Sequence, residues 1–236
     1  MRAVRMCFLQ MLLFIKKDRM LSAACFAPLL AGAAFRFLVP VLDRIMAGWF
    51  SGALILRPYY GLIDVLFSML ASIMFCYAAA MVILEEVDDH IAGYLFVTVL
   101  GKEGYLLARL GIPAAAAFVF TVILLPFFRL HGSGISSIVC LAAGGALQGL
   151  ILALLIAALS ANKLEGMAVT KLSSLTVMGA AVPYFFHGNV QYVFSWLPSF
   201  WIGKLAYHGE LLYILPMMAT SALWIWFLVK RFVNKI

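Results

Sequence analysis

Long apolar stretches recur along almost the whole of this chain and limit what it can fold into. Of its 236 residues, 66% are hydrophobic and only 11% are charged, far outside the range of soluble domains. A helix needs about 20 apolar residues to cross a bilayer. Six stretches approach this length, at residues 22–42, 60–84, 106–128, 135–159, 172–186 and 211–229. The sequence therefore predicts an all-α, polytopic membrane protein with six transmembrane helices, forming a single transmembrane domain over residues 1–236.

Two further segments are predicted to lie at the membrane surface or to enter it only partly. Residues 1–19 hold about ten apolar residues between basic ends, too few to span, and no small-residue cleavage site follows them. We expect a retained interfacial helix there. The fifth stretch, 172–186, is short and contains Pro183, so it is expected to be broken or completed by a re-entrant segment. The aromatic-rich connection 187–210 is the predicted external re-entrant segment.

Basic residues are distributed unevenly over this helix map. If both termini are cytoplasmic, that side holds twelve of the 17 Lys and Arg residues: Arg2, Arg5, Lys16, Lys17, Arg19, Lys102, Arg109, Lys163, Lys171, Lys230, Arg231 and Lys235. The other side holds Arg44, Arg57, Arg129 and Lys204. This bias predicts a multi-pass protein of the plasma (inner) membrane with cytoplasmic N- and C-termini. The net charge of +7 then reflects topology and contact with anionic lipid, not nucleic-acid binding.

Four acids lie within five residues where the second apolar stretch ends. Glu85, Glu86, Asp88 and Asp89 would each cost roughly 3 kcal/mol at the centre of an inserted helix. They therefore mark a water-exposed turn, residues 85–105, which the predicted orientation places in the cytoplasm. From the residues alone, this turn is either a simple solvated connection or a docking site.

Polar side chains within the predicted spans are few. Asp64, Ser68 and Ser72 recur every four residues and therefore share one face of their helix. Arg36 lies at a similar outer depth, because the first helix runs outward. An isolated Arg in a span costs roughly 3 kcal/mol, so we predict that Arg36 and Asp64 form a buried ion pair.

The usual signatures of a membrane enzyme are missing from the sequence. There is no HExxH zinc motif, no Gly-x-Ser-x-Gly nucleophile motif and no GxxxxGK[ST] phosphate-binding loop. The four histidines fall near helix ends or in loops, so no metal site is predicted. We expect a non-enzymatic chain without cofactors, in which any ATP and Mg²⁺ bind a partner subunit. An ion-coupled secondary transporter stays an alternative with little support, because few titratable groups lie within the spans.

The acidic turn and its flanks also carry a family resemblance. Residues 81–111, MVILEEVDDHIAGYLFVTVLGKEGYLLARLG, resemble the end of helix two, the coupling helix and the start of helix three in permeases of the type 2 ABC exporter family. The glycine of that pattern corresponds to Gly93, and the basic residue entering the next span to Arg109. Two features depart from the family: residues 89–93 replace its usual Glu-Gly-Thr, and the residue after Thr98 is Val, not Pro.

The resemblance extends over essentially the whole chain. ALSANKLEGMAVTKLSSL, residues 158–175, is similar to the second cytoplasmic turn of these permeases, and LPSFWIGKL, residues 197–205, to their external segment before helix six. The order and spacing of six spans after an interfacial helix agree as well. Among relatives, the chain resembles permeases named as drug exporters, including fluoroquinolone exporters.

This resemblance implies a function and a set of site residues. The chain would be the permease subunit of an ATP-driven exporter of an amphipathic or hydrophobic drug, peptide or lipid, working as a homo- or heterodimer with separate ABC ATPase subunits. The residues implied in ATPase docking and coupling are Glu85, Glu86, Asp88, Asp89 and Gly93. Those implied in the substrate pathway are Ser68, Ser72, Tyr77 and Thr176. A non-transporting sensor or regulatory membrane subunit stays open as an alternative.

Overall fold

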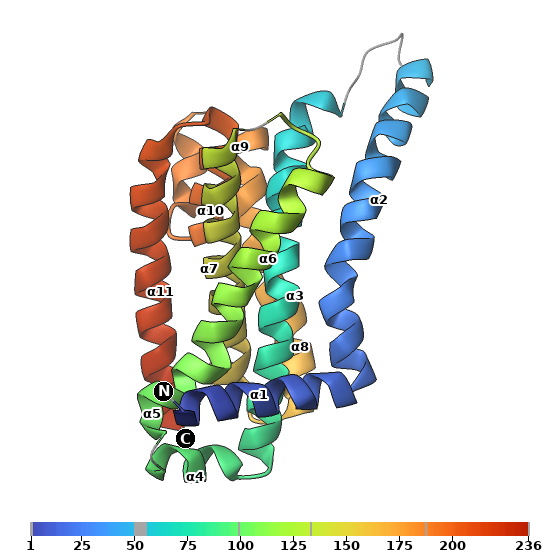
Figure 1. Ribbon diagram of the computed structural model, residues 1–236. Coiled ribbons are helices and arrows are strands. Elements are labelled where there is room, and N and C mark those ends of the chain that lie inside the picture. Colours follow the sequence, from blue (N-terminus) through green and yellow to red (C-terminus); the bar gives the residue numbers. More distant parts are fainter. Residues whose placement is uncertain (1, 50–55, 99, 133, 187, 236) are drawn as a thin grey trace.

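The computed structural model describes residues 2–49, 56–98, 100–132, 134–186 and 188–235 and is built from helices (Figure 1). Within these ranges, five helical stretches are long and apolar enough to cross a membrane: Arg19–Trp49, Arg57–Asp88, Gly101–Phe128, Ile135–Leu159 and Leu211–Lys235. They correspond to the first four predicted spans and the last. The predicted all-helical membrane architecture is confirmed, but the count of six spans is not.

Several of these stretches combine more than one helical element. The first is α2 (Arg19–Trp49) and the fourth is α7 (Ile135–Leu159). The others are η1 (Arg57–Tyr59) with α3 (Tyr60–Asp88); α5 (Gly101–Leu106) with the π-helical η2 (Leu107–Gly111) and α6 (Ile112–Phe128); and η5 (Leu211–Tyr213) with α11 (Ile214–Lys235). At the majority of their ends, the observed helices extend a few residues beyond the predicted spans. Hydropathy locates a helix boundary only approximately.

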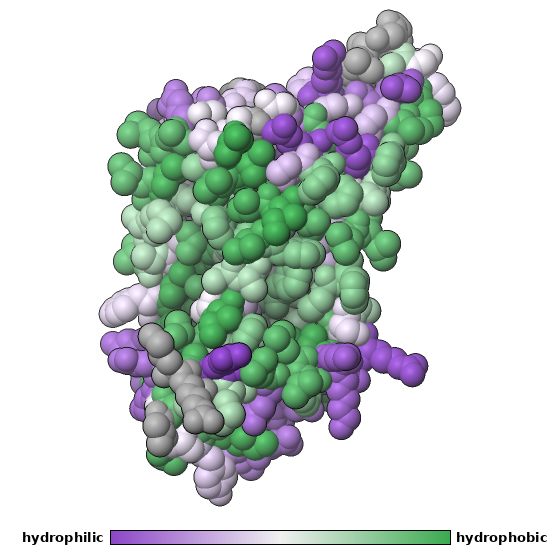
Figure 2. Space-filling model, in the orientation of Figure 1, coloured by the Kyte–Doolittle hydropathy of each residue, from purple (hydrophilic) through white to green (hydrophobic). Residues whose placement is uncertain are grey.

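The core of the bundle is the contact between α3 and α7. Their side chains are mostly buried, whereas α2 and α11 expose most of theirs. The exposed side chains of α2 and α11 are largely Leu, Phe, Val and Trp. Figure 2 shows apolar side chains across the middle of one face and hydrophilic ones toward both ends. This distribution is the one expected where lipid covers the middle of the molecule.

The predicted fifth span, 172–186, is not one continuous α-helix. The chain passes from α8 (Lys163–Ser173) into the 3₁₀-helix η3 (Ser174–Ala181) and then into the single turn of α9 (Val182–Phe185). Eight residues is long for a 3₁₀-helix. Pro183 lies at the start of α9, where its missing N–H does not interrupt the helix. The break expected from Pro183 is present, but it takes the form of this change of helix type.

The connection predicted to re-enter the membrane contains a well-packed helix. It includes η4 (Asn189–Phe194) and α10 (Pro198–His208), and α10 packs against η3, α7 and α11. Phe200 and Ile202 of α10 are fully buried. Figure 1 places α9 and α10 at the end of the bundle opposite to α1 and α4. How deeply this segment enters the bilayer stays a prediction.

The end of the bundle that carries α1 is also where the acidic turn lies. The helix α1 (Arg2–Lys17) runs across the long helices (Figure 1), with Cys7 and Met11 buried against them and Met6 and Leu13 exposed. The short helix α4 (Ile91–Val97) covers the same end. The predicted interfacial helix is therefore present as a separate helix, and its location in a membrane interface stays a prediction.

Candidate functional site

The acidic turn joins α3 to α4 through a sharp change of direction. Asp89 closes α3, and His90 follows with a left-handed φ of 57°. A non-glycine residue rarely adopts this conformation. It breaks the helix at once, so that α4 leaves α3 at a steep angle (Figure 1). The acids before the break consequently face elements that are distant in the sequence.

Glu86 is bonded within the protein. Its carboxylate accepts hydrogen bonds from Arg109 Nε at 3.1 Å and from the Tyr105 hydroxyl at 2.8 Å, and it forms an ion pair with Arg109 Nη2. Arg109 Nη1 also donates to the carbonyl oxygen of Cys7 at 3.0 Å. The side chains of Arg109 and Glu86 are only 3% and 13% exposed. This buried pair ties together the end of α3, the π-helical η2 and α1.

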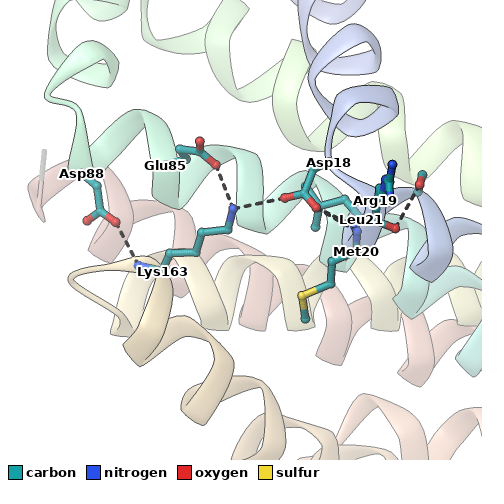
Figure 3. A network of polar contacts seen from close by, with 8 residues as sticks. Asp18, Arg19, Met20, Leu21, Glu85, Asp88 and Lys163 are labelled. Atoms are coloured by element: carbon teal, nitrogen blue, oxygen red, sulfur yellow. Dashed lines mark hydrogen bonds and ion pairs between the residues drawn. The ribbon is translucent and has the colours of Figure 1, made fainter.

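Lys163, at the start of α8, contacts the carboxylates of Asp18, Glu85 and Asp88 (Figure 3). Its Nζ lies 2.9 Å from Glu85 and 3.4 Å from Asp18, and its backbone N–H donates to Asp88 at 3.0 Å. Asp18 also caps α2 by accepting from the backbone N–H of Met20 at 2.8 Å. A carboxylate at the first turn of α8 suits the positive end of that helix. The resulting Lys163 cluster joins α2, α3 and α8.

The pKa shifts of this cluster define a pH window. Burial is the largest single influence on the pKa of Asp18 and raises it, but the capped backbone N–H groups and Lys163 together outweigh burial and lower the pKa below 3.8. Burial lowers the pKa of Lys163, but its bonds to Glu85 and Asp18 outweigh burial and raise it above 10.5. A lowered acid stabilises the fold above its unfolded pKa, and a raised lysine below its own. The cluster is therefore at full strength between about pH 4 and pH 10.

We predict that Lys163→Met destabilises the fold only at pH values where the ion pairs of Lys163 are charged. The midpoint of thermal unfolding, measured against pH in detergent, should be lower for the variant from about pH 4 to 10 and should converge on the wild type above about pH 11. The difference should shrink in high salt, because these side chains are about one-third exposed. Lys171→Met, at an exposed position later in α8, serves as the control. A pH-independent difference would contradict the assignment.

Most of the four acids thus have bonding partners within the chain, and their role in docking stays a prediction. Glu85, Glu86 and Asp88 bond within the chain, while Asp89 and Gly93 are exposed. Sequence reasoning missed Asp18 and Lys163. The position of Asp18 directly before an apolar run was the available signal, because Asp favours the N-cap.

The surface of α4 offers a different contact. Ile91, Tyr94 and Val97 recur every three residues and are exposed, whereas Ala92 is buried and Phe96 packs on the core. A mixed polar and apolar cleft of about 500 Å³ lies beside this helix, lined by Asp88, His90, Gly93 and residues of α11 and the α7–α8 turn. The exposed face of α4 was not distinguished in the sequence, because seven residues give too short a period.

Two of the predicted pathway residues are enclosed in helix packing. Ser68 and Ser72 are fully buried: Ser68 donates to the carbonyl oxygen of Leu141 at 2.8 Å, and the Ser72 hydroxyl lies 3.1 Å from that of Thr121. They join α3 to α7 and α6 and line no open surface, which corrects the expectation that they face a pathway in this conformation. The reason is that α3 lies at the centre of the bundle, where α6 and α7 cover the face that carries both serines.

The other two pathway residues are partly exposed. Tyr77 is half-buried on α3. Thr176 lies in η3, where it accepts a hydrogen bond from Gln148 at 2.9 Å. Three of the four predicted pathway residues thus lie on α3 and the fourth on η3. Only Thr176 lies in the irregular segment that replaces the fifth span.

The predicted ion pair between Arg36 and Asp64 does not form. Arg36 Nη1 donates to the carbonyl oxygen of Arg129 at 2.8 Å, and Asp64 accepts from the backbone N–H groups of Leu130 and His131 at 2.8 and 2.9 Å. No ion pair between described residues joins Arg36 to Asp64. Both side chains instead hold the turn after α6, because backbone groups at a helix end need partners as much as the charges do.

The sequence matches a family of known proteins. Residues 12–229 match the family described as fluoroquinolones export permease protein Rv2686c-like. The chain belongs to this family. The similarity of the sequence to export permeases is thereby confirmed, and the chain is an integral membrane protein of the permease class.

Two members of this family from Mycobacterium tuberculosis illustrate the similarity. The fluoroquinolones export permease proteins MT2760, of strain CDC 1551 / Oshkosh, and Rv2686c, of strain ATCC 25618 / H37Rv, are each 27% identical to this chain over 232 residues. The alignments cover 92% of this chain and 88% of each relative. No solved structure matches.

A second candidate site is a groove beside the broken fifth span. An apolar groove of about 570 Å³ lies along η3 and α9, lined by Met178, Phe185, Phe186, Phe194 and their neighbours. Its size falls in the range of pockets for drug-sized molecules. Several of the side chains that line it, among them Met178, Phe185 and Phe186, are exposed on the surface of the single chain.

Proposed function

We propose that this chain is the permease subunit of an ATP-driven drug exporter and that a separate ABC ATPase subunit docks on α4. The exposed apolar face of α4 carries the proposal. Ile91, Tyr94 and Val97 are 43%, 73% and 84% exposed, on a helix beyond the ends of the long spans. Water would surround this face in isolation, and an exposed apolar patch at such a place is typical of a protein interface. ATP and Mg²⁺ would bind the partner and not this chain.

The orientation that we propose puts both termini and α4 in the cytoplasm. The support is the uneven distribution of Lys and Arg, which favours the end that carries α1 and the start of α8 as the inner side. Cytoplasmic ATP would then be available to a subunit bound at α4. The aromatic-rich end with α9 and α10 would face outward.

The bonds of the acidic turn support a route for mechanical coupling. Closure of two ATPase subunits on ATP would press on α4. Glu86, through Arg109, would pass the displacement to η2 and α1, while Glu85 and Asp88, through Lys163, would pass it to α8. Since α8 leads directly into η3, movement at α4 would reach the apolar groove. Rigid elements joined by such contacts are the usual means of transmitting a domain closure.

For the substrate, we propose an amphipathic or hydrophobic drug that enters the groove along η3 from the lipid. The relatives are named for fluoroquinolones, and the groove has the size and apolar lining that a compound of that scale needs. We further propose that two permease subunits, identical or related, enclose the complete pathway. The exposed Leu175, Met178 and Phe185, which line the groove, would then face the second subunit.

The docking proposal predicts a large effect of two truncations on α4. Tyr94→Ala combined with Val97→Ala should lower drug-stimulated ATP hydrolysis by the reconstituted complex at least about tenfold, because a central aromatic anchor of an interface is commonly worth 2 kcal/mol or more. Copurification with the ATPase subunit should fall in parallel. Asp89→Lys, at an exposed acid, should have a smaller and salt-dependent effect.

Leu215→Ala is the matched control, since Leu215 is 71% exposed on α11 at the opposite end of the bundle. It should leave hydrolysis and copurification unchanged. If the α4 variant folds and still binds the ATPase normally, docking on α4 is rejected. If the wild-type chain binds no ATPase while it remains folded, a sensor or regulatory role is favoured instead.

A further inference from the structure

A buried lysine without an acidic partner lies at the end of the bundle opposite to α4. Lys204 of α10 is 2% exposed, yet none of the ion pairs among the described residues includes it. Its Nζ donates to the Tyr192 hydroxyl at 2.6 Å. Four aromatic rings surround it, with centroids at 3.9 Å (Tyr192), 5.2 Å (Tyr213), 5.6 Å (Phe200) and 5.9 Å (Trp201). An ammonium group has three donors and no acceptor, so one phenol and the ring faces leave two donors without a hydrogen bond to a described residue.

The aromatic cage offsets only part of what burial costs this ammonium. Contact with an aromatic face stabilises a cation less than water does, so these rings compensate only in part for the lost hydration of the ammonium. A carboxylate would satisfy the ammonium better than the neutral Tyr192 hydroxyl, because the attraction between opposite charges adds to the hydrogen bond in a buried site. The site is therefore chemically complementary to an anion.

The apolar groove and the ammonium lie on two sides of the same short segment. In η4, Phe194 lines the groove, while Tyr192 covers Lys204. Beneath them, Val182 and Leu197 line the groove and pack against Phe200, whose ring faces the ammonium. A single layer of side chains thus separates the apolar groove from the buried positive charge.

The η4 side chains of this layer are largely exposed. Tyr192 is 46% exposed, and its neighbours Val190 and Val193 are 64% and 69% exposed. None of these three side chains is enclosed in the core. A rotation of the Tyr192 side chain toward solvent would break one hydrogen bond to Lys204 and open the ammonium toward Phe194 and the groove.

We propose that the groove and Lys204 together form a binding site for an amphipathic anion, with its apolar rings along η3 and its carboxylate on the ammonium in place of the Tyr192 hydroxyl. This deepens the export function proposed above and rests on it, since it names the class of substrate. The groove supplies affinity through apolar burial, and Lys204 supplies selectivity for a negative head group. At the outer end of the bundle, such a site would hold the substrate just before release.

Three probes that share one ring system test the proposal in the absence of the ATPase. They are 2-naphthoate, 2-naphthylmethanol and 2-naphthylmethylammonium, and their binding to the purified permease in nanodiscs of zwitterionic phosphatidylcholine can be followed by naphthalene fluorescence. The wild type should bind the anion at least about tenfold more tightly than the alcohol, after correction for binding to empty nanodiscs. The ammonium probe should bind most weakly.

Substitutions separate the two halves of the site. Lys204→Met should abolish the preference for naphthoate and leave binding of the alcohol unchanged, while Lys204→Arg should keep the preference. Phe194→Ala should weaken all three probes alike. Tyr192→Phe removes the competing hydroxyl but keeps the ring, so it should strengthen naphthoate binding a few-fold without affecting the alcohol. Lys171→Met should change nothing.

Each outcome decides the proposal. Equal binding of naphthoate and the alcohol to the wild type overturns it, as does a preference that survives in Lys204→Met. If Lys204→Met fails to fold, Lys204→Arg and Tyr192→Phe decide by the same criteria. If phosphatidylglycerol displaces naphthoate and stabilises the protein through Lys204 while no naphthoate preference is seen, the site serves a lipid and the proposal fails. Because the ATPase is absent, failure of docking on α4 cannot mimic any of these results.

Discussion

Replacing Arg109 by Met is expected to destabilise the protein by about 3 to 5 kcal/mol, the range for removing one partner of a buried ion pair. The variant leaves the Glu86 carboxylate, only 13% exposed, without its cation, and it also frees the carbonyl oxygen of Cys7. Loss of α1 packing should accompany the global effect. Unfolding of the purified protein, followed by circular dichroism against temperature and denaturant, measures the change.

A second substitution distinguishes the lost pair from lost packing. Glu86→Leu in the Arg109→Met background removes the uncompensated charge, so the double variant should recover part of the lost stability. Its destabilisation should be smaller than the sum of the destabilisations of the two single variants. Lys102→Met, at an exposed basic position seven residues earlier, should be nearly neutral. If the two single changes are additive, Glu86 and Arg109 do not act as a pair.

The position of the acidic turn could be read from the sequence because hydrocarbon excludes charge, which is a local property of the chain. The partners of the acids could not be read in this way. Arg109 and Lys163 lie 23 and 78 residues from the acids that they bind, and hydropathy carries no information on such distances. The sequence therefore indicated where the turn lies, but not that Glu86 anchors it or that α4 exposes its apolar face.

The fifth span shows a different limit of sequence reasoning. Its apolar composition predicts membrane insertion equally well for an α-helix, a 3₁₀-helix or a broken segment. The form that it takes depends on α10, whose Gly203 approaches η3 so closely that a Cβ at Gly203 would lie 2.2 Å from the carbonyl oxygen of Ala180. A contact between segments decides the local conformation here, and Pro183 alone indicated only that some break was present.

The predicted pair of Arg36 and Asp64 was wrong for a related reason. Both residues were placed at the correct end of the bundle, and both do need partners. The prediction paired one side chain with the other, whereas backbone carbonyl and N–H groups after α6 serve equally well as acceptors and donors. Charged residues near a helix end compete for free backbone groups as well as for each other.

Gly145 of α7 packs directly against the backbone of α3, so a large effect of an added side chain is expected there. A Cβ there would lie 2.7 Å from the backbone oxygen of Ser68 and 2.8 Å from its hydroxyl oxygen, so the central α3–α7 contact has no room for it. Gly145→Ala should cost about 1 to 3 kcal/mol, the usual range for overpacking, and Gly145→Val should prevent stable assembly. Small residues permit such close approach between membrane helices, and backbone atoms on the opposing side cannot rotate away.

Gly48→Ala provides the control, because a Cβ at Gly48 in α2 meets nothing within 4 Å. It should be neutral or slightly stabilising, since alanine loses less chain entropy in a helix than glycine does. Retention of monodisperse, folded protein after detergent extraction and the unfolding midpoint would be measured for all three variants. Equal behaviour of Gly145→Ala and Gly48→Ala would mean that α3 and α7 separate easily, and the coupling route from α4 through a rigid α3 would then lose its mechanical basis.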